Sequence, residues 1–186
     1  MLSTIQNTAI SILIYFLVVF LSYGLYHLLK KRFKSEEYLK IARDIFKTIF
    51  FLLILVYFKI STAISFALDF PLLVIYGVIV IVFLLVFTKK ESNEFALHTK
   101  VSAILLTPII EEIICRGIAY NAENIVCSFI LGTVVFIVFH FAFDAKSIVY
   151  FFCIAFLLFG LRMQSGSVLN SMLLHSLINF VVIYRK

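Results

Sequence analysis

The chain has 186 residues, of which 63% are hydrophobic and only 14% charged, with 22 phenylalanines and a formal net charge of +6. Soluble domains are typically about 45–50% apolar, and a chain this short cannot bury helices that are hydrophobic on every side, which argues against a soluble fold. The basic residues cluster between apolar runs, a pattern that indicates contact with anionic lipid and not with nucleic acid. We therefore expect an all-α, polytopic transmembrane bundle of about six to eight helices, forming one domain over 1–186 in the lipid bilayer.

Seven apolar runs approach the roughly 20 residues that a helix needs to cross the hydrocarbon core. The segment between the first two, Lys30 to Asp44, mixes charged and apolar residues and predicts a solvated loop or an interfacial amphipathic helix. Thr88 to Lys100 is expected to be a polar linker. In chain order, the expected spans are Thr8–Leu29, Ile45–Phe58 or its extension to Leu68, Pro71–Phe87, Val101–Tyr120, Ile125–Phe143, Ser147–Leu161 and Ser167–Tyr184.

The distribution of basic residues predicts how the chain is oriented. If the N-terminus lies outside, all but three of the 16 lysines and arginines fall in loops on the cytoplasmic side, the exceptions being Lys59, Arg116 and Arg162. Because Lys and Arg are enriched in cytoplasmic loops, we expect seven spans and a cytoplasmic C-terminus. A multi-pass protein of the bacterial plasma membrane is the expected setting.

Two adjacent glutamates, Glu111 and Glu112, lie inside the fourth apolar run. A charge at membrane depth costs roughly 2.5 kcal/mol or more, so ionisable residues there indicate a functional site. Glu112 and Arg116 are four residues apart in the favourable order for a helical ion pair. Glu111 has no cation at that spacing, which favours proton transfer by Glu111 and a supporting role for the Glu112–Arg116 pair. The alternative is that both acids lie at a water interface and end the helix.

Two of the three later apolar runs carry one histidine each. His140 follows Phe136 by four residues, and Asn179 follows His175 by four, so each pair shares one face of a helix. Imidazole and carboxamide groups can bind a water, hold an oxyanion or ligate a metal. Each spacing alone is equally compatible with packing or interhelical hydrogen bonds.

The three cysteines, Cys115, Cys127 and Cys153, have no metal-binding spacing. We expect them to be small apolar packing residues. The functional alternative is that Cys115, beside Arg116, is a nucleophile.

The ordered set of motifs resembles the CAAX prenyl protease and bacteriocin-processing (Abi) family of intramembrane proteases. That family carries EExxxR, FxxxH and Hxxx(N/D), which read here as Glu111 to Arg116, Phe136 to His140 and His175 to Asn179. The resemblance covers about residues 97–184. It implies an intramembrane endopeptidase in which Glu111 activates a water, His140 holds it, and His175 with Asn179 stabilises the oxyanion or completes the water site. The implied partner is a peptide or membrane-protein substrate.

Metal dependence stays open at this point. A catalytic zinc site takes three protein ligands and keeps one open position, and Glu111, His140 and His175 are candidates for those ligands. A Glu–His site can equally activate water without a metal. Two other functions also stay open: a non-catalytic membrane protein for bacteriocin immunity or scaffolding, and a small proton-coupled transporter, since carboxylates and histidines also build proton relays.

Overall fold

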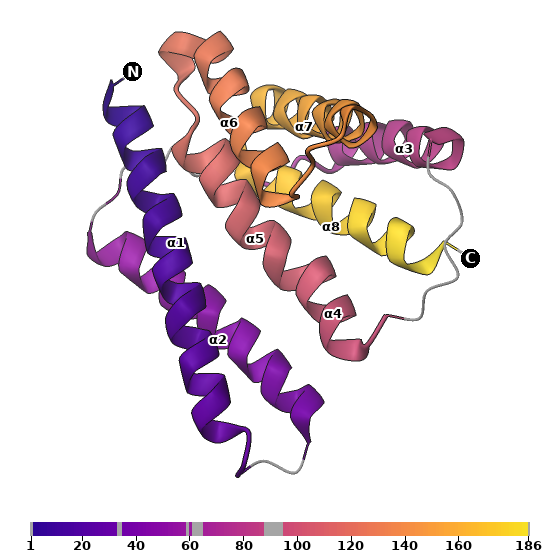
Figure 1. Cartoon of the computed structure of the whole chain (residues 1–186). Helices are drawn as coiled ribbons and strands as arrows, with labels where there is room; N and C mark the ends of the chain where they lie inside the picture. Colours follow the sequence, from indigo (N-terminus) through magenta and orange to yellow (C-terminus); the bar gives the residue numbers. More distant parts are fainter. Residues whose placement is uncertain (1, 33–34, 59, 61–64, 88–94, 186) are drawn as a thin grey trace.

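A computed structural model describes residues 2–32, 35–58, 60, 65–87 and 95–185 of the chain, and within these ranges it contains only helices, turns and connecting segments (Figure 1). The helical elements are α1 (Leu2–Leu29), α2 (Glu36–Tyr57), α3 (Phe70–Phe87), α4 (Leu97–Val101), η1 (Ser102–Leu106), α5 (Thr107–Glu112), η2 (Ile113–Ile118), η3 (Ala122–Asn124), α6 (Ile125–Phe139), α7 (Ala145–Ser165) and α8 (Val168–Tyr184).

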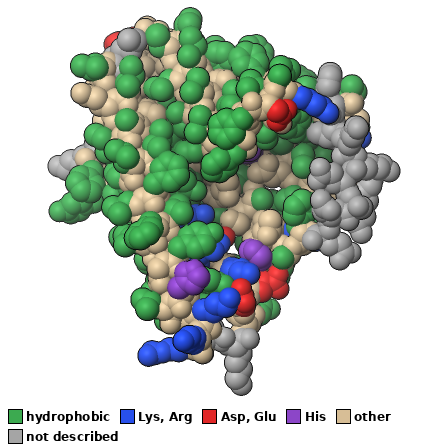
Figure 2. Space-filling model, in the orientation of Figure 1, with side chains coloured by type: hydrophobic (Ala, Val, Ile, Leu, Met, Phe, Trp, Pro, Cys, Tyr) green, Lys and Arg blue, Asp and Glu red, His purple; other side chains and the backbone are tan. Residues whose placement is uncertain are grey.

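The composition of these helices matches a bilayer. Three are long and apolar enough to cross a membrane by length and composition: Leu2–Leu29, Ala122–Phe139 and Ala145–Ser165. Two more, α3 and α8, are apolar but shorter. Large hydrophobic side chains such as Phe20 and Val126 are exposed, and hydrophobic side chains are spread over much of the face in Figure 2. The expected all-α membrane fold is confirmed, and the chain is an integral membrane protein.

Several expected boundaries are wrong. α2 begins at Glu36, so much of the expected Lys30–Asp44 loop is helical. Its first turn carries Glu36 and Glu37, and acids there favour a helix N-terminus. The extension of this span to Leu68 is also wrong, because α2 ends at Tyr57 and residues 65–69 are not helical. Lys59 and the first part of the expected Thr88–Lys100 linker, residues 88–94, lie outside the described residues.

The fifth and sixth helices differ from the expected spans in opposite directions. α6 ends at Phe139, four residues before the expected end at Phe143, because His140 leaves helical geometry and Phe141 has a positive φ of 49°. α7 continues to Ser165, beyond the expected end at Leu161, and stops where Gly166 adopts a left-handed conformation. Glycine has no Cβ and adopts that conformation at little cost. The early end of α6 places His140 at a helix terminus.

The segments from α4 to η2 form one continuous rod at the centre of the bundle (Figure 1). This rod contacts α1 and α2 on one side and α6 and α8 on others, while α3 packs against α7 and α8. Its apolar residues Ile110, Ile114 and Ile118 are buried in the core. The rod therefore holds any polar side chain on its inner faces away from lipid.

Two π-helical turns, η1 and η2, flank the short α5 segment in this rod. Such turns are rare, add a residue to the helical turn and are frequent at functional sites. Close to η2, the backbone of Gly132 on α6 lies against the carbonyl oxygen of Cys115, and a Cβ on Gly132 would clash with it. The glycine allows α6 and η2 to pack backbone to backbone.

Candidate active site

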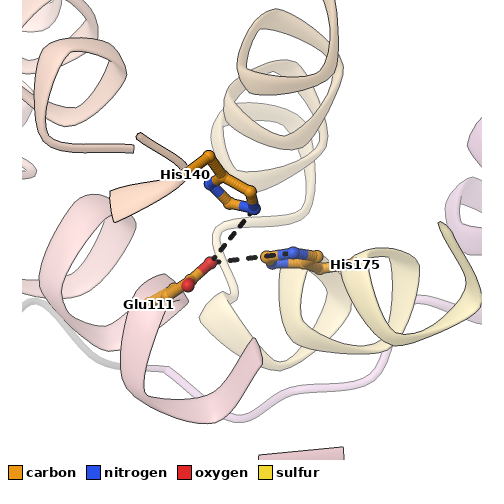
Figure 3. Close-up of side chains that lie close together, drawn as sticks. All are labelled: Glu111, His140 and His175. Atoms are coloured by element: carbon orange, nitrogen blue, oxygen red, sulfur yellow. Dashed lines mark ion pairs between the residues drawn. The ribbon is translucent and has the colours of Figure 1, made fainter. Parts of the chain in front are cut away.

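Glu111, His140 and His175 come together at the centre of the molecule, although they lie on three different elements (Figure 3). Glu111 is on α5, His140 caps the C-terminal end of α6, and His175 is on α8. Nε2 of His140 lies 3.9 Å from Oε2 of Glu111, and Nε2 of His175 lies 3.8 Å from the same oxygen. The motifs that are far apart in the sequence therefore meet around one carboxylate oxygen.

His140 is oriented by its own helix and by two phenyl rings. Its Nδ1 lies 2.9 Å from the carbonyl oxygen of Phe136. Because a carbonyl only accepts, this bond requires the proton on Nδ1. The imidazole ring centroid is 4.5 Å from that of Phe136 and 4.3 Å from that of Phe151. These contacts leave Nε2 directed at Glu111 with its lone pair free.

His175 is oriented by the second glutamate. Its Nδ1 lies 3.0 Å from Oε1 of Glu112, which also accepts from Nη1 of Arg116 at 2.9 Å. The exposed fractions of Glu112, Arg116 and His175 are 0%, 1% and 1%, so this chain of contacts is sealed in the core. A carboxylate behind a histidine fixes its tautomer and the orientation of its ring. Nε2 of His175 therefore faces Glu111 as an acceptor too.

Three acceptor atoms thus converge: two imidazole nitrogens and one carboxylate oxygen. Oε2 of Glu111 is buried and has no hydrogen-bond partner among the described protein atoms. One ligand atom from each of the three side chains lies within 4.8 Å of the others. Acceptors repel one another unless a proton donor or a cation lies between them, so the cluster suits a water molecule or a metal ion.

A cavity of about 490 Å³ reaches Glu111, His140 and Asn179. Polar side chains on several elements line it, including Arg43, Asp44, His98, Thr99, Ser102 and Thr107. Arg43 and Asp44 form an ion pair of 2.8 Å on α2. In Figure 2, charged side chains gather at the end of the molecule that holds the ends of α1, α2 and α4. A second cavity, of about 290 Å³, lies between the start of α1 and α6, and none of the predicted site residues lines it.

Asn179 lines the first cavity, but its amide is already engaged. Its Nδ2 donates to the carbonyl oxygen of Ala103 at 2.7 Å, which ties α8 to the π-helical turn η1. The structure therefore places all six predicted site residues in or beside one cluster, with Glu111, His140 and Asn179 at the cavity and Glu112, Arg116 and His175 behind it.

Some contacts of this cluster are not evident from the sequence. The motif spacing gave no sign that Glu112 bonds to His175, because the two residues are 63 positions apart. Phe136 contacts His140 as expected, and its ring also lies 4.5 Å from the Arg116 guanidinium. Phe151 carries no sequence signal beyond its hydrophobicity. Arg162 had one signal, since it is a basic residue away from the predicted cytoplasmic loops.

The fold and the cluster together define the class of protein. It is a helical integral membrane protein with a buried carboxylate and two imidazoles at a polar cavity. Residues 93–181 match the family model described as type II CAAX prenyl endopeptidase, Rce1-like. That segment contains every predicted site residue, and the match confirms the resemblance to CAAX prenyl proteases. The family description points to a peptidase acting on a peptide or protein in a membrane. No curated protein and no solved structure matches the chain.

Proposed function

We propose that this protein is an intramembrane endopeptidase that hydrolyses a membrane-associated peptide, with a water activated by Glu111 as the nucleophile. The observation that carries the proposal is the convergence of the Glu111 carboxylate and both histidine Nε2 atoms within 4 Å across three helices. The family match supports the reaction class independently. The polar cavity supplies a path for water to a site that is otherwise enclosed.

In the proposed reaction, a water lies between Glu111 and the imidazoles of His140 and His175. The Glu111 carboxylate accepts a proton from it while the water oxygen bonds to the carbonyl carbon of the scissile peptide. Glu111 then gives that proton to the amide nitrogen as the carbon–nitrogen bond breaks. The water donates its other proton to Nε2 of one of the two histidines, and Glu112 with Arg116 holds His175 in the required tautomer.

The oxyanion role expected for His175 and Asn179 stays a prediction. In the geometry described above, the proton of His175 is on Nδ1 and directed to Glu112, while Nδ2 of Asn179 donates to Ala103. His175 would have to exchange its partner before it donated to an oxyanion, whereas Asn179 keeps a second N–H on Nδ2. The arrangement as it stands favours a role for His175 in shaping the water site.

Zinc is the metal that this cluster fits best. Two imidazole nitrogens and a carboxylate oxygen are a ligand set of catalytic zinc sites, and Glu111, His140 and His175 would hold the ion. A bound zinc would supply Lewis acidity and lower the pKa of the water. Glu111 would then be a ligand in place of the base, and both histidines would offer the lone pair of Nε2 in their neutral forms.

The proposed setting is the bacterial plasma membrane, with the C-terminus in the cytoplasm. Maturation of a leader or signalling peptide, or self-immunity against a bacteriocin, are the biological roles that we propose for such a peptidase. Both roles require a lipophilic substrate that reaches the site through the bilayer.

Comparison of membrane peptides by mass spectrometry, from cells with the native protein and with Glu111→Gln, tests the proposal. We expect peptide products and new termini that appear only with the native protein, because glutamine cannot accept the proton from water. Glu123→Gln is the matched control, since Glu123 is an exposed glutamate outside the cluster, and it should give the native products. A parallel culture treated with a membrane-permeant zinc chelator reports whether the products depend on the metal.

The same variants separate the other functions. Protection against a bacteriocin that persists in a folded Glu111→Gln protein would contradict proteolysis and favour non-catalytic immunity. Flux that depends on a pH gradient, without any new peptide termini, would favour a proton-coupled transporter.

A further inference from the structure

Arg162 is a buried arginine that belongs to none of the three motifs. It lies on α7 and is only 4% exposed. A cation inside an apolar helix is costly to bury and is retained where it has a partner or a task. Its guanidinium lies 4.4 Å from the ring centroid of Tyr120, and its Nε donates to the carbonyl oxygen of Arg116 at 3.2 Å. Arg162 therefore joins α7 to the end of the central rod.

The Arg116 carbonyl lies in the last turn of the π-helical segment η2. Carbonyls in the last turn of a helix have no partner from the helix itself and need one from elsewhere. In the π pattern, the donor would be the backbone N–H of the residue five positions on, which is Asn121. That N–H instead donates to Oγ of Ser128 at 2.7 Å. Arg162 supplies a donor at this position from another helix.

Arg116 connects this contact to the cluster. Its side chain donates to Oε1 of Glu112 at 2.9 Å, and the same oxygen lies 3.0 Å from Nδ1 of His175. Nε2 of His175 in turn faces Glu111. A continuous series of buried contacts thus runs from α7 through η2 to α8 and the carboxylate oxygen.

We propose that Arg162 is a positioning residue for this site: by donating to the Arg116 carbonyl it holds the last turn of η2 against α7, keeps the Arg116 side chain at Glu112, and so fixes the imidazole of His175. This inference rests on the proposed function for its catalytic consequence. Loss of the donor frees the Arg116 backbone to move relative to α7. That movement shifts the Arg116 side chain relative to Glu112 and frees His175 to change tautomer.

The imidazole ¹⁵N signals of His175 test the proposal without any substrate. The full-length protein, labelled at histidine nitrogens and kept in lipid nanodiscs with a metal chelator, is compared with Arg162→Gln and Arg162→Lys. His175→Gln assigns the signals. We expect one His175 tautomer, protonated at Nδ1, in the native protein and a second tautomer in Arg162→Gln. Arg162→Lys, which keeps a charged donor, should shift the balance less.

Arg185→Gln is the matched control. Arg185 also donates to helix carbonyls, those of Leu84 and Leu85 on α3, and it directly follows the last residue of α8. Its removal should leave the His175 signals unchanged. The signals of His27 serve as an internal reference in every variant, and gel filtration with a melting curve confirms that each variant is folded.

The second measurement is the rate at which the products that require Glu111 form in cells, at matched protein levels. Loss of a group that orients an active-site histidine typically costs about 10- to 100-fold, so we expect at least about a 10-fold fall for Arg162→Gln and partial recovery for Arg162→Lys. A native His175 tautomer in folded Arg162→Gln, with native product formation, would overturn the inference. If the native protein forms no such products, the proposed function fails, and the His175 signals still decide the positioning role. If Arg162→Gln does not fold, Arg162→Lys decides it: His175 signals and product formation identical to Arg185→Gln overturn the inference.

Discussion

At the scale of single residues, the site depends on which atoms carry protons. Nδ1 of each histidine has an acceptor, Phe136 for His140 and Glu112 for His175. In the neutral imidazoles, both Nε2 atoms are therefore hydrogen-bond acceptors that face Glu111. With both imidazoles neutral, the three acceptors repel one another, and the surrounding hydrogen bonds hold them in place. We therefore expect the supporting residues to matter to the proposed chemistry as much as Glu111.

The buried Glu112–Arg116 pair gives a prediction at this scale. Arg116→Met leaves the Glu112 charge buried with one fewer partner, and breaking a buried pair in this way typically costs about 3–5 kcal/mol. We expect a loss of that order in the free energy of unfolding, measured by denaturant titration in mixed micelles.

The double variant Glu112→Gln with Arg116→Met is the control, because it removes both charges while glutamine can still accept from His175. It should recover much of the loss in stability. A single variant as stable as the native protein would show that the pair contributes little.

At the scale of elements, the central rod brings the pieces into register. α6 approaches η2 so closely that the Gly132 backbone lies against the Cys115 carbonyl. Gly132→Ala must push the two helices apart, and overpacking of this kind typically costs about 1–3 kcal/mol. We expect a lower melting temperature, and weaker product formation because His140 moves with α6.

Gly24→Ala is the matched control for Gly132→Ala. A Cβ on Gly24 would have nothing within 4 Å, and alanine is favoured over glycine inside a helix. The melting temperature of this variant should be equal to or above that of the native protein. Equal stability of the two alanine variants would contradict the close packing of α6 on η2.

The hairpin of α1 and α2 gives a prediction about pH. Hydrogen bonds from Lys40, Tyr26 and Lys30 lower the pKa of Glu36 from 4.5 to about 2. Tyr26 belongs to α1 and Glu36 to α2, so the carboxylate joins the two helices. Because the folded pKa is the lower one, this stabilisation is present above pH 4.5 and is lost as the pH falls toward 2.

Melting curves of the native protein and Glu36→Gln over this pH range test the contribution. The native protein should melt at a slightly higher temperature at pH 6, and the difference should disappear toward pH 2. The effect should be small and salt-sensitive, since the Glu36 side chain is 46% exposed. A difference in melting temperature between the two proteins that does not change with pH would contradict the predicted contribution of Glu36.

At the scale of the whole molecule, charge is distributed unevenly. Charged side chains gather at the end that holds the α1–α2 turn and α4 (Figure 2), and hydrophobic side chains cover much of the remainder. Because basic residues favour the cytoplasmic side, we expect this end and the C-terminus to lie there. A green fluorescent protein fused after Lys186 should fluoresce, whereas an alkaline phosphatase fused there should be inactive. Phosphatase inserted between Asn121 and Asn124 should be active, and the opposite pattern would contradict the topology.

The sequence alone was sufficient for the fold class and for the identity of the cluster. Hydrophobicity requires a bilayer, and helices are the natural way to satisfy the backbone there. Glu111, His140 and His175 stand out because ionisable groups are costly in such surroundings. The Glu112–Arg116 pair also followed from the sequence, since its four-residue spacing is a local property of one helix.

Only the tertiary structure decided how these residues are connected. The early end of α6, the two π-helical turns and the bond between Glu112 and His175 all depend on packing between segments distant in the chain. Local spacing carries no information about such contacts, because they form only when the helices pack against one another. Arg162 shows the contrast between sequence and tertiary structure. The sequence shows only that an apolar helix contains a charge, and the fold gives that charge a partner on the central rod.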